Sequence, residues 1–285
     1  MAANPAPAVP KPGLAHDRSW LGRRVRRFDP APIISIAALV VLWEIASMFA
    51  SDQTIPGVGA VLGKLNDLVT SSASLKDYGI TMARIMAGLV AAFVVGSVLG
   101  LVSGAQPTVA RYVLPVIRFI QGIPSVSWVV LAVVWFSSTE LRIWFIMIMV
   151  TLPGFTLQLH DSYRAISSEL REMARSFRPS RWALFREVTL PAVTPGIYTS
   201  WKVNLGLGIR VVLIAELVGA TTGIGVRLLN SQQLFDMPSV VAWTLLLALS
   251  ALAIQGLLEL TERRALGYRL RDDDKVSKST PVIAG

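Results

Sequence analysis

Long apolar runs alternate with shorter polar segments along this chain. An apolar run of about 20 residues is long enough to cross a bilayer as a helix. We therefore predict an all-α integral membrane protein with six transmembrane helices, at residues 33–50, 85–105, 112–137, 143–159, 195–219 and 237–258. The third run is broken at Gly122–Pro124, and the fourth is short and contains Pro153.

The longest polar stretch, apart from the two ends of the chain, is the arginine-rich segment 165–197. It predicts a hairpin of two short helices. Ser168 can cap the first helix, and Glu169 and Glu172 occupy its first turn, where the helix dipole favours acidic side chains. This helix should end near Arg178–Pro179, because a residue before proline is pushed out of helical geometry.

Ser180 can cap the second helix of the hairpin, Arg181–Val188, which Leu190–Pro191 should end. Trp182 and Phe185 share one side of this helix, and charged residues occupy much of the rest. Aromatic side chains beside arginines suit insertion into a cleft of another protein, since such residues dominate interface energetics. The alternative is an amphipathic loop that lies on anionic lipid, which the charge also allows.

The composition excludes several classes of protein. Of the 285 residues, 53% are hydrophobic and 16% are charged, and the mean hydropathy is +0.56, which is too apolar for an ordinary soluble domain. The net charge of +9 gathers in loops and at the ends, so we expect no nucleic-acid partner. The absence of cysteine excludes disulfides and thiolate chemistry, and the two histidines are poorly placed for a metal site.

Loops rich in arginine alternate along the chain with lean loops, which carry little net charge, and this alternation sets the predicted orientation. Arginine concentrates in the N-terminal tail, in the turn between the second and third runs, in the hairpin and at the C-terminal end. The connections with little net charge are 51–84, 138–142 and 220–236. Both termini and the hairpin are therefore predicted to be cytoplasmic.

The chain divides into two tails and one membrane domain. Residues 1–31 are rich in proline and alanine and then in arginine, which predicts a disordered basic tail that anchors at the lipid surface. They lack the apolar core and cleavage site of a removable signal peptide. The transmembrane domain covers 32–265, with the hairpin at 165–191, and 266–285 form a second cytoplasmic tail.

The break in the third run points to residues that line a pathway. Irregular backbone at membrane depth is tolerated only where it is buried in protein or lines a cavity. We therefore take Gln121, Ser125, Ser127 and Trp128 as candidates. The alternative is a proline kink that neighbouring side chains fill.

The fifth run contains charged residues, and each costs about 2.5–3.5 kcal/mol at mid-bilayer. Arg210 and Glu216 are separated by about 9 Å of helix, too far for an easy pair. Arg210 either faces a central pathway, where it attracts an anion, or is satisfied by Glu44 or by a carbonyl of a neighbouring helix. Lys202 is nearer the inner surface, where it should snorkel.

Glycines and amphipathic spacing indicate three further features. Gly96, Gly100 and Gly104 recur every four residues, which either gives a smooth face for close helix contact or reflects how common glycine is in membrane helices. Segment 57–70 has apolar residues at helical spacing and can lie on the outer membrane surface. The glycine-rich loop 219–227 either meets a soluble binding protein or is a flexible turn.

The stretch EMARSFRPSRWALFREVTLPAVTPGI resembles the EAA motif of the membrane subunits of ABC-type importers, the binding-protein-dependent permeases. Glu172 and Ala174 stand at the motif's Glu and second Ala, and Leu190–Pro191 stands at its Leu-Pro end. Met173 replaces the first Ala. Arg178 replaces the motif's glycine, so the chain must turn there without glycine's freedom.

Further stretches carry a wider resemblance: LWEIA at 42–46, TIPGVGAVLGKL at 54–65, TMARIMAGLVAAFVVGSVLGLVSG at 81–104, RFIQGIPSVSWVVLAVVWF at 118–136 and LGLGIRVVLIAELVGATTGIGVRL at 205–228. Together they resemble one branch of the family, the nitrate, sulfonate and taurine permeases, over about residues 30–265. Glu216 matches an acidic position of this branch near the outer end and is a further pathway candidate. Arg210 stands where the branch usually has an apolar residue.

The resemblance implies a type I ABC importer permease fold and a transport subunit rather than an enzyme. The second hairpin helix would be the coupling helix, seated in a groove of a cytoplasmic ATPase. The coupling residues are then Glu172, Ala174, Arg178, Ser180, Arg181, Trp182, Phe185, Leu190 and Pro191. The chain contains no Gly-rich phosphate loop ending in Gly-Lys-Ser/Thr, so ATP and Mg²⁺ would be bound by the partner.

The resemblance further implies a complex in a bacterial inner membrane. Two copies of the chain would surround a two-fold axis, with two ATPase subunits below and a solute-binding protein above. ATP binding would close the ATPases, draw the coupling helices together and turn the pathway outward, and hydrolysis would reset it. The solute would be small and anionic or organic, of the nitrate, sulfonate or taurine kind.

Two other classes of function stay open. An intramembrane enzyme needs a nucleophile with a base, or clustered His, Asp and Glu residues. Only His160, with Asp161 beside it, lies near the membrane, and it has no second ligand. An ion-coupled carrier would use Glu44 and Glu216 as its coupling acids.

Overall fold

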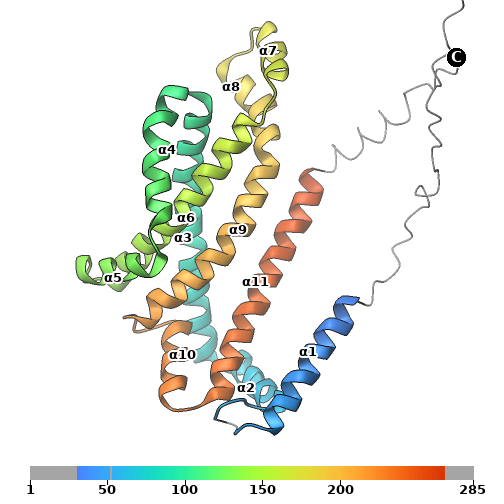
Figure 1. The fold of residues 1–285 in the computed structure, drawn as a ribbon, viewed down its shortest axis with the longest axis vertical. Helices are drawn as coiled ribbons and strands as arrows, with labels where there is room; N and C mark the ends of the chain where they lie inside the picture. Colours follow the sequence, from blue (N-terminus) through green and yellow to red (C-terminus); the bar gives the residue numbers. More distant parts are fainter. Residues whose placement is uncertain (1–30, 52, 267–285) are drawn as a thin grey trace, which may run out of the picture.

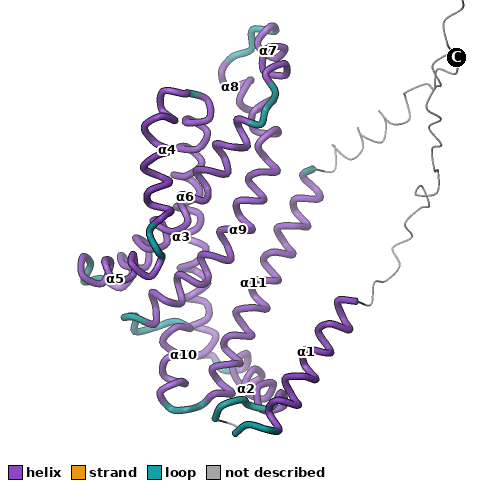
Figure 2. The backbone as a smooth tube through the Cα atoms, viewed as in Figure 1, coloured by secondary structure: helices purple, strands orange, loops and turns teal. Residues whose placement is uncertain are grey.

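The computed structural model describes residues 31–51 and 53–266, and this part of the chain is helical, without strands (Figures 1 and 2). The elements are α1 (Ala31–Met48), α2 (Val58–Thr70), α3 (Ser72–Ala105), α4 (Pro107–Gly122), α5 (Ser125–Trp135), α6 (Thr139–Arg164), α7 (Ser168–Ser176), α8 (Arg181–Leu184), the π-helix η2 (Phe185–Thr189), α9 (Leu190–Leu217), α10 (Ile224–Gln233) and α11 (Met237–Ala265). The two predicted tails lie outside the described residues, apart from one residue of each.

Each of the predicted apolar runs forms helix. Helices α3, α6 and α11 are long and apolar enough to cross a bilayer, and α4 with α5 would form a fourth crossing that is bent by 92°. The apolar part of α1 is shorter, and α9 contains Lys202, Arg210 and Glu216. The break in the third run is therefore confirmed, whereas the count of six crossings stays a prediction.

Helix α6 is longer than the run 143–159 that predicted it. It covers 26 residues, and Pro153 lies inside it without ending it. Polar residues at both ends extend the helix beyond the apolar run, so hydropathy alone underestimates its length. The prediction of a short fourth helix is wrong.

Helices α3, α6 and α9 form the centre of the fold (Figure 1). Leu89 of α3 and Leu205 of α9 are fully buried there. The rings of Phe93, Phe155 and Trp201 form a triangle with centroids 5.3, 5.3 and 5.7 Å apart, which joins one aromatic side chain from each of the three helices. Aromatic contacts of this kind add to the stabilisation from apolar burial.

The glycines of α3 allow α6 to approach closely. A Cβ atom at Gly100 would lie 2.6 Å from the carbonyl oxygen of Thr156, and one at Gly104 would lie 2.8 Å from Tyr163 Cβ. Gly96 faces Phe155 in the same way. Of the two interpretations of this spacing, close helix contact is confirmed.

The predicted amphipathic segment is helix α2, and its apolar face contacts protein. Val61 is buried, and Leu68 packs against the cluster that contains Trp243 of α11. The ion pair between Lys64 and Asp236, 3.2 Å long, joins α2 to the start of α11. The location of α2 on a membrane surface stays a prediction.

The basic loops among the described residues lie at one end of the molecule, and two of the three connections with little net charge, 51–84 and 220–236, lie at the other. Figure 1 places the α3–α4 turn, α7, α8 and the end of α11 toward the top, which we call the hairpin end. Helices α2 and α10 lie toward the bottom, which we call the α10 end. The alternation of charge along the sequence therefore corresponds to two sides of the fold.

Candidate functional site

Helices α7 and α8 form the predicted hairpin (Figure 1). Glu169 lies in the first turn of α7, as expected, whereas Glu172 lies beyond that turn, so the prediction is wrong for Glu172. The cap is Ser167 and not Ser168, because the Oγ atom of Ser167 accepts a hydrogen bond from the backbone N–H of Leu170 at 3.3 Å. The predicted cap is wrong by one residue, since two consecutive serines carry the same sequence signal.

The turn between α7 and α8 contains Arg178, whose φ is 47°. This is the left-handed region, which glycine adopts freely but which costs a residue with a Cβ atom about 1–2 kcal/mol. The EAA motif has glycine at this position. The chain thus makes a turn of the kind that glycine favours, with a strained arginine.

Helix α8 carries the aromatic surface of the hairpin. Ser180 caps it as predicted, with its Oγ atom accepting from Ala183 N at 3.1 Å. The rings of Trp182 and Phe185 stack, with centroids 5.8 Å apart and planes inclined by 28°. Trp182 is 68% exposed. An exposed tryptophan stacked on a half-buried phenylalanine is suited to anchor a protein partner.

The other predicted coupling residues lie on the same hairpin. Glu172 and Arg181 are exposed, and Ala174 is buried between α7 and α8. The two helices enclose a small groove of about 250 Å³, lined by Leu170, Met173, Ala174, Phe177, Pro179, Ala183, Leu184, Glu187 and Val188. The hairpin is therefore a packed unit with an aromatic outer surface.

The sequence predicted that the second hairpin helix ends at Leu190–Pro191, and this prediction is wrong. The π-helix η2 joins α8 to α9 without a break, and the backbone N–H of Leu190 donates to the carbonyl of Phe185. Pro191 falls in the first turn of α9, where a missing N–H is tolerated. One continuous helical element therefore connects the aromatic surface to the centre of the fold.

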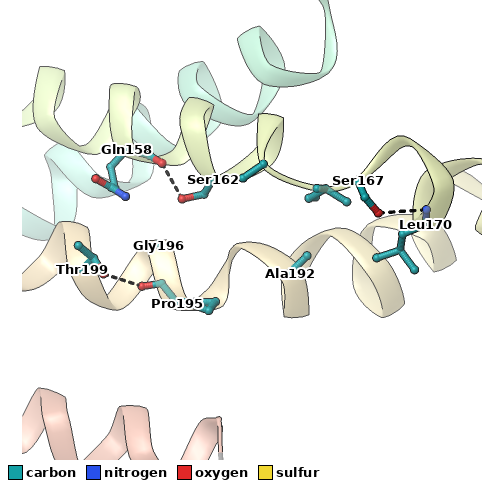
Figure 3. A pocket seen from close by; sticks show the side chains of 10 residues that line it. Gln158, Ser162, Ser167, Leu170, Ala192, Pro195, Gly196 and Thr199 are labelled. Atoms are coloured by element: carbon teal, nitrogen blue, oxygen red, sulfur yellow. Dashed lines mark hydrogen bonds between the residues drawn. The ribbon is translucent and has the colours of Figure 1, made fainter. Parts of the chain in front are cut away.

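Below the hairpin, α6 and α9 enclose a cavity of about 580 Å³ (Figure 3). Ser162 donates to the carbonyl of Gln158 at 2.7 Å, and Thr199 donates to that of Pro195 at 3.0 Å, so these hydroxyl groups bond within their own helices. The side chains that line the cavity carry no charge. At Gly196 the two helices approach so closely that a Cβ atom would overlap the Ser162 hydroxyl.

A second cavity, of about 270 Å³, lies at the break between α4 and α5. Three of the predicted pathway residues, Gln121, Ser125 and Trp128, line it, whereas Ser127 does not; their place in a pathway stays a prediction. Leu207 of α9 also contributes to the wall. The break therefore leaves a space that neighbouring side chains do not fill.

The charged residues of α9 differ in their partners. Arg210 is exposed and makes no hydrogen bond or ion pair within the described part of the chain. The alternative in which Glu44 satisfies it is wrong, because Glu44 accepts from Val58 N at 2.9 Å and thereby caps α2. Lys202 pairs with Glu262 of α11 at 2.5 Å.

Glu216 belongs to a buried ion-pair network near the α10 end, which was not predicted from the sequence. Its side chain accepts from Arg84 Nη1 at 2.8 Å and from Thr81 Oγ1 at 2.9 and 3.0 Å, and the residue is only 1% exposed. Arg84 also donates from Nε to Glu140 at 3.1 Å. A buried charge is tolerated when it is paired and hydrogen-bonded. The network ties α3, α6 and α9 together.

The same network holds the loop 219–227. Three successive backbone N–H groups, of Gly223, Ile224 and Gly225, donate to side chains of α3 and α9 at 3.2, 2.9 and 2.9 Å. Gly223 has a φ of 115°, and a Cβ atom there would lie 2.5 Å from a carboxylate oxygen of Glu216. An unconstrained flexible turn does not fit these bonds.

A sequence signal for this network exists in α3. Asp77, Thr81 and Arg84 follow one another at spacings of four and three residues, so they share one face of an otherwise apolar helix. Asp77 accepts from Arg227 Nε at 2.5 Å, which extends the network to α10. A cavity of about 430 Å³ beside this pair is lined by Ala73, Lys76, Asp77, Thr221, Thr222, Gly223, Val226, Arg227 and Asn230.

Asp236 caps α11 at the same end of the molecule. Its side chain accepts from Ser239 N at 3.3 Å. Burial would raise the pKa of Asp236, but hydrogen bonds from Ser239 and the nearby Lys64 outweigh burial and lower this pKa below its ordinary value. Among the described residues, no group of His, Asp and Glu side chains is arranged to hold a metal ion.

Comparison with known proteins identifies the family of this chain. Residues 92–267 match the family described as "Binding-protein-dependent transport system inner membrane component". The chain belongs to this family. The hairpin and the helices that carry it are therefore parts of a permease.

Relatives of this permease support the branch that the sequence indicated. The taurine transport system permease protein TauC of Escherichia coli is 25% identical, over 81% of this chain and 88% of the relative. The putative aliphatic sulfonates transport permease protein SsuC of Bacillus subtilis is 21% identical, over 94% and 98%. The nitrate import permease protein NrtB of Synechocystis is 24% identical, over 68% and 74%.

The fold of the permease is that of an ABC importer. An inward-facing structure of the MetNI methionine ABC transporter aligns with a TM-score of 0.53 at 17% identity, over 73% of this chain and 95% of that chain. This permease is thus a membrane subunit of an ABC importer. Its family implies an ABC ATPase and a solute-binding protein as partners.

Proposed function

We propose that this permease imports a small anionic or organic solute of the sulfonate, taurine or nitrate kind. The names of its relatives support this class of solute. Arg210 also supports it, since the side chain is exposed on α9 and makes no bond within the described residues. An arginine at membrane depth without a partner attracts anions into a pathway.

Two copies of the chain form the pathway in this proposal. An exposed stripe on α9 contains Val203, Leu207, Arg210 and Leu217, at the spacing of one helix face. In a two-fold arrangement this face meets its own copy across the pathway. The lining residues at the α4–α5 break, Gln121 among them, border the same stripe through Leu207.

The hairpin couples the permease to its ATPase, which binds ATP and Mg²⁺ on behalf of the complex. The observation that carries this part is the stack of the exposed Trp182 on the half-buried Phe185. Because α8, η2 and α9 form one helical element, a displacement of the aromatic surface moves α9 and its pathway face directly. The chain itself has a transport role and no catalytic one.

The complex lies in a bacterial inner membrane, with the hairpin and both termini in the cytoplasm. The gathering of arginine-rich loops at the hairpin end supports this orientation. The α10 end then faces outward, and its network holds the loop 219–227 in a fixed shape for the solute-binding protein. The exposed apolar side chains of α1 contact lipid.

Replacing both Trp182 and Phe185 with alanine tests the coupling. We expect a folded permease whose complex hydrolyses ATP without importing solute, because the aromatic anchor of the hairpin is lost. The measurement compares ATP hydrolysis with uptake of a radiolabelled sulfonate in proteoliposomes that contain the ATPase and the binding protein.

The control is Leu234→Ala, which removes an exposed apolar side chain at the α10 end, away from the hairpin. This variant should keep the wild-type ratio of uptake to hydrolysis. Normal uptake by the double alanine variant would reject the role of the hairpin.

A further inference from the structure

The break between α4 and α5, whose residues line the second cavity, lies about midway between the hairpin end and the α10 end (Figure 1). The two helices meet there at 92°. Its walls combine apolar side chains with few polar ones, as in pockets that bind small molecules. At about 270 Å³ it lies just below the usual range of about 300–1,000 Å³, so it accommodates only a small solute.

Two helix ends of opposite polarity border this cavity. Helix α5 begins at Ser125 without any side-chain cap, so the positive end of its dipole borders the space at Ser125, while the N–H of Ser127 donates to the carbonyl of Pro124 at 2.9 Å. Helix α4 ends at Gly122, where the last carbonyl groups form a negative end. Broken membrane helices bind anionic groups at such N-termini and cations at such C-termini.

Unpaired polar groups add to this polarity. Trp128 lines the cavity one turn into α5, and its indole Nε1 donor has no partner among the described residues. Asn204 lies directly behind the lining residue Gly154, where a Cβ atom would be 2.6 Å from Asn204 Oδ1. That oxygen also has no partner within the described part. A buried donor left unpaired costs about 1–3 kcal/mol, and a ligand in the cavity can recover this for Trp128, since Trp128 lines the cavity and Asn204 does not.

The cavity has no charged side chain in its lining. A ligand with a net charge would therefore enter it without a compensating ion, which is costly at membrane depth. A zwitterion avoids this cost, because its two charges are neutralised separately by the two helix ends. Ile120, Ile123 and Met149 provide apolar contacts for the short carbon chain between the charges.

We propose that this cavity binds a small zwitterionic solute, such as an aminosulfonate or an amino acid. The oxyanion group lies at the start of α5, near Ser125 and Trp128, and the ammonium group lies at the carbonyl end of α4. The assignment rests on the proposed import function and narrows its solute class. It places a solute site within the permease itself, in addition to that of the solute-binding protein.

Three probes of similar size test the polarity of the site. Taurine carries both charges, ethanesulfonate only the negative charge and ethylammonium only the positive charge. Each is titrated calorimetrically into the purified permease–ATPase complex without binding protein. Taurine should bind most tightly, about ten-fold more tightly than either single ion. Equal or tighter binding of ethanesulfonate, or no binding of taurine, would overturn the assignment.

A substitution tests the position of the oxyanion. Ser125→Asp places a carboxylate at the N-terminus of α5, where it stabilises the helix but repels a sulfonate. Taurine affinity should fall by about ten-fold or more. Ser138→Asp is the matched control, because Ser138 is the N-cap residue of α6, its side chain makes no capping hydrogen bond, and it does not line the cavity. This variant should leave taurine affinity unchanged.

Uptake assays separate this inference from the proposed function. ATP-dependent uptake with the binding protein is measured for the wild type and both variants. If the wild-type complex imports solute and Ser125→Asp binds taurine as tightly as the wild type, the cavity assignment is overturned and the proposed function is not. The absence of ATP-dependent uptake of any sulfonate, nitrate or taurine by the wild-type complex would overturn the proposed function.

Discussion

Replacing Arg178 with glycine should stabilise the coupling hairpin, because the φ of 47° at this residue is strained for arginine and free for glycine. Relief of the left-handed strain gains about 1–2 kcal/mol. Glycine also loses more backbone entropy on folding, about 0.5–1 kcal/mol. The net gain is therefore about 0–1.5 kcal/mol, and its midpoint of about 0.75 kcal/mol is roughly a three- to four-fold shift toward the closed turn.

Amide hydrogen exchange of α7 and α8 in the nanodisc-embedded permease measures this gain directly. Arg178→Ala is the matched variant, since it removes the same charge but keeps the Cβ atom and hence the strain. Exchange in the hairpin should be slowest in Arg178→Gly and no slower than wild type in Arg178→Ala. If the two variants exchange at the same rate, backbone strain does not control this turn and the reasoning is refuted.

Two further substitutions probe the membrane part of the fold. Glu216→Gln should destabilise the permease by about 3 kcal/mol, because it leaves the buried Arg84 with one carboxylate fewer. Thermal unfolding measures this loss of stability. Glu140→Gln is the control and should cost clearly less, because the Glu140 side chain is half-exposed. Gly100→Ala should cost about 1–3 kcal/mol by forcing α3 from α6, whereas Gly256→Ala, with open space around it, should not lower the melting temperature.

Local signals in the sequence were enough to predict several parts of the site. The cap at Ser180, the shared side of Trp182 and Phe185 and the break before Pro124 each depend on residues within about one or two helical turns. Their physical causes, a serine hydroxyl, a shared helix face and a missing backbone N–H, act over that short range. For these elements the pattern and the geometry agree.

The features that the sequence did not predict depend on distant residues or on an unusual backbone. Arg84 and Glu216 are 132 positions apart, and only the packing of α3 on α9 brings them together. The π-helix before Pro191 shifts the hydrogen-bond ladder, which lets a helix continue where proline normally ends one. No propensity rule assigns a positive φ to Arg178; the resemblance to a motif with glycine there was the only hint.

The two acids that an ion-coupled carrier would need already have structural partners. Glu44 accepts from the backbone of Val58, and Glu216 accepts from Arg84, Thr81 and the backbone of Gly225. A coupling acid must release its partners in each transport cycle. Both carboxylates instead fix neighbouring helices, which favours a mechanism driven through the hairpin.

Uptake by reconstituted proteoliposomes tests the central claim, that the hairpin transmits force from a separate ATPase. The liposomes contain the permease alone or together with its ATPase, and the binding protein and radiolabelled solute are added outside. Solute should accumulate against its gradient only when the ATPase and internal ATP are both present. Accumulation by the permease alone, without any nucleotide-hydrolysing partner, would contradict the account.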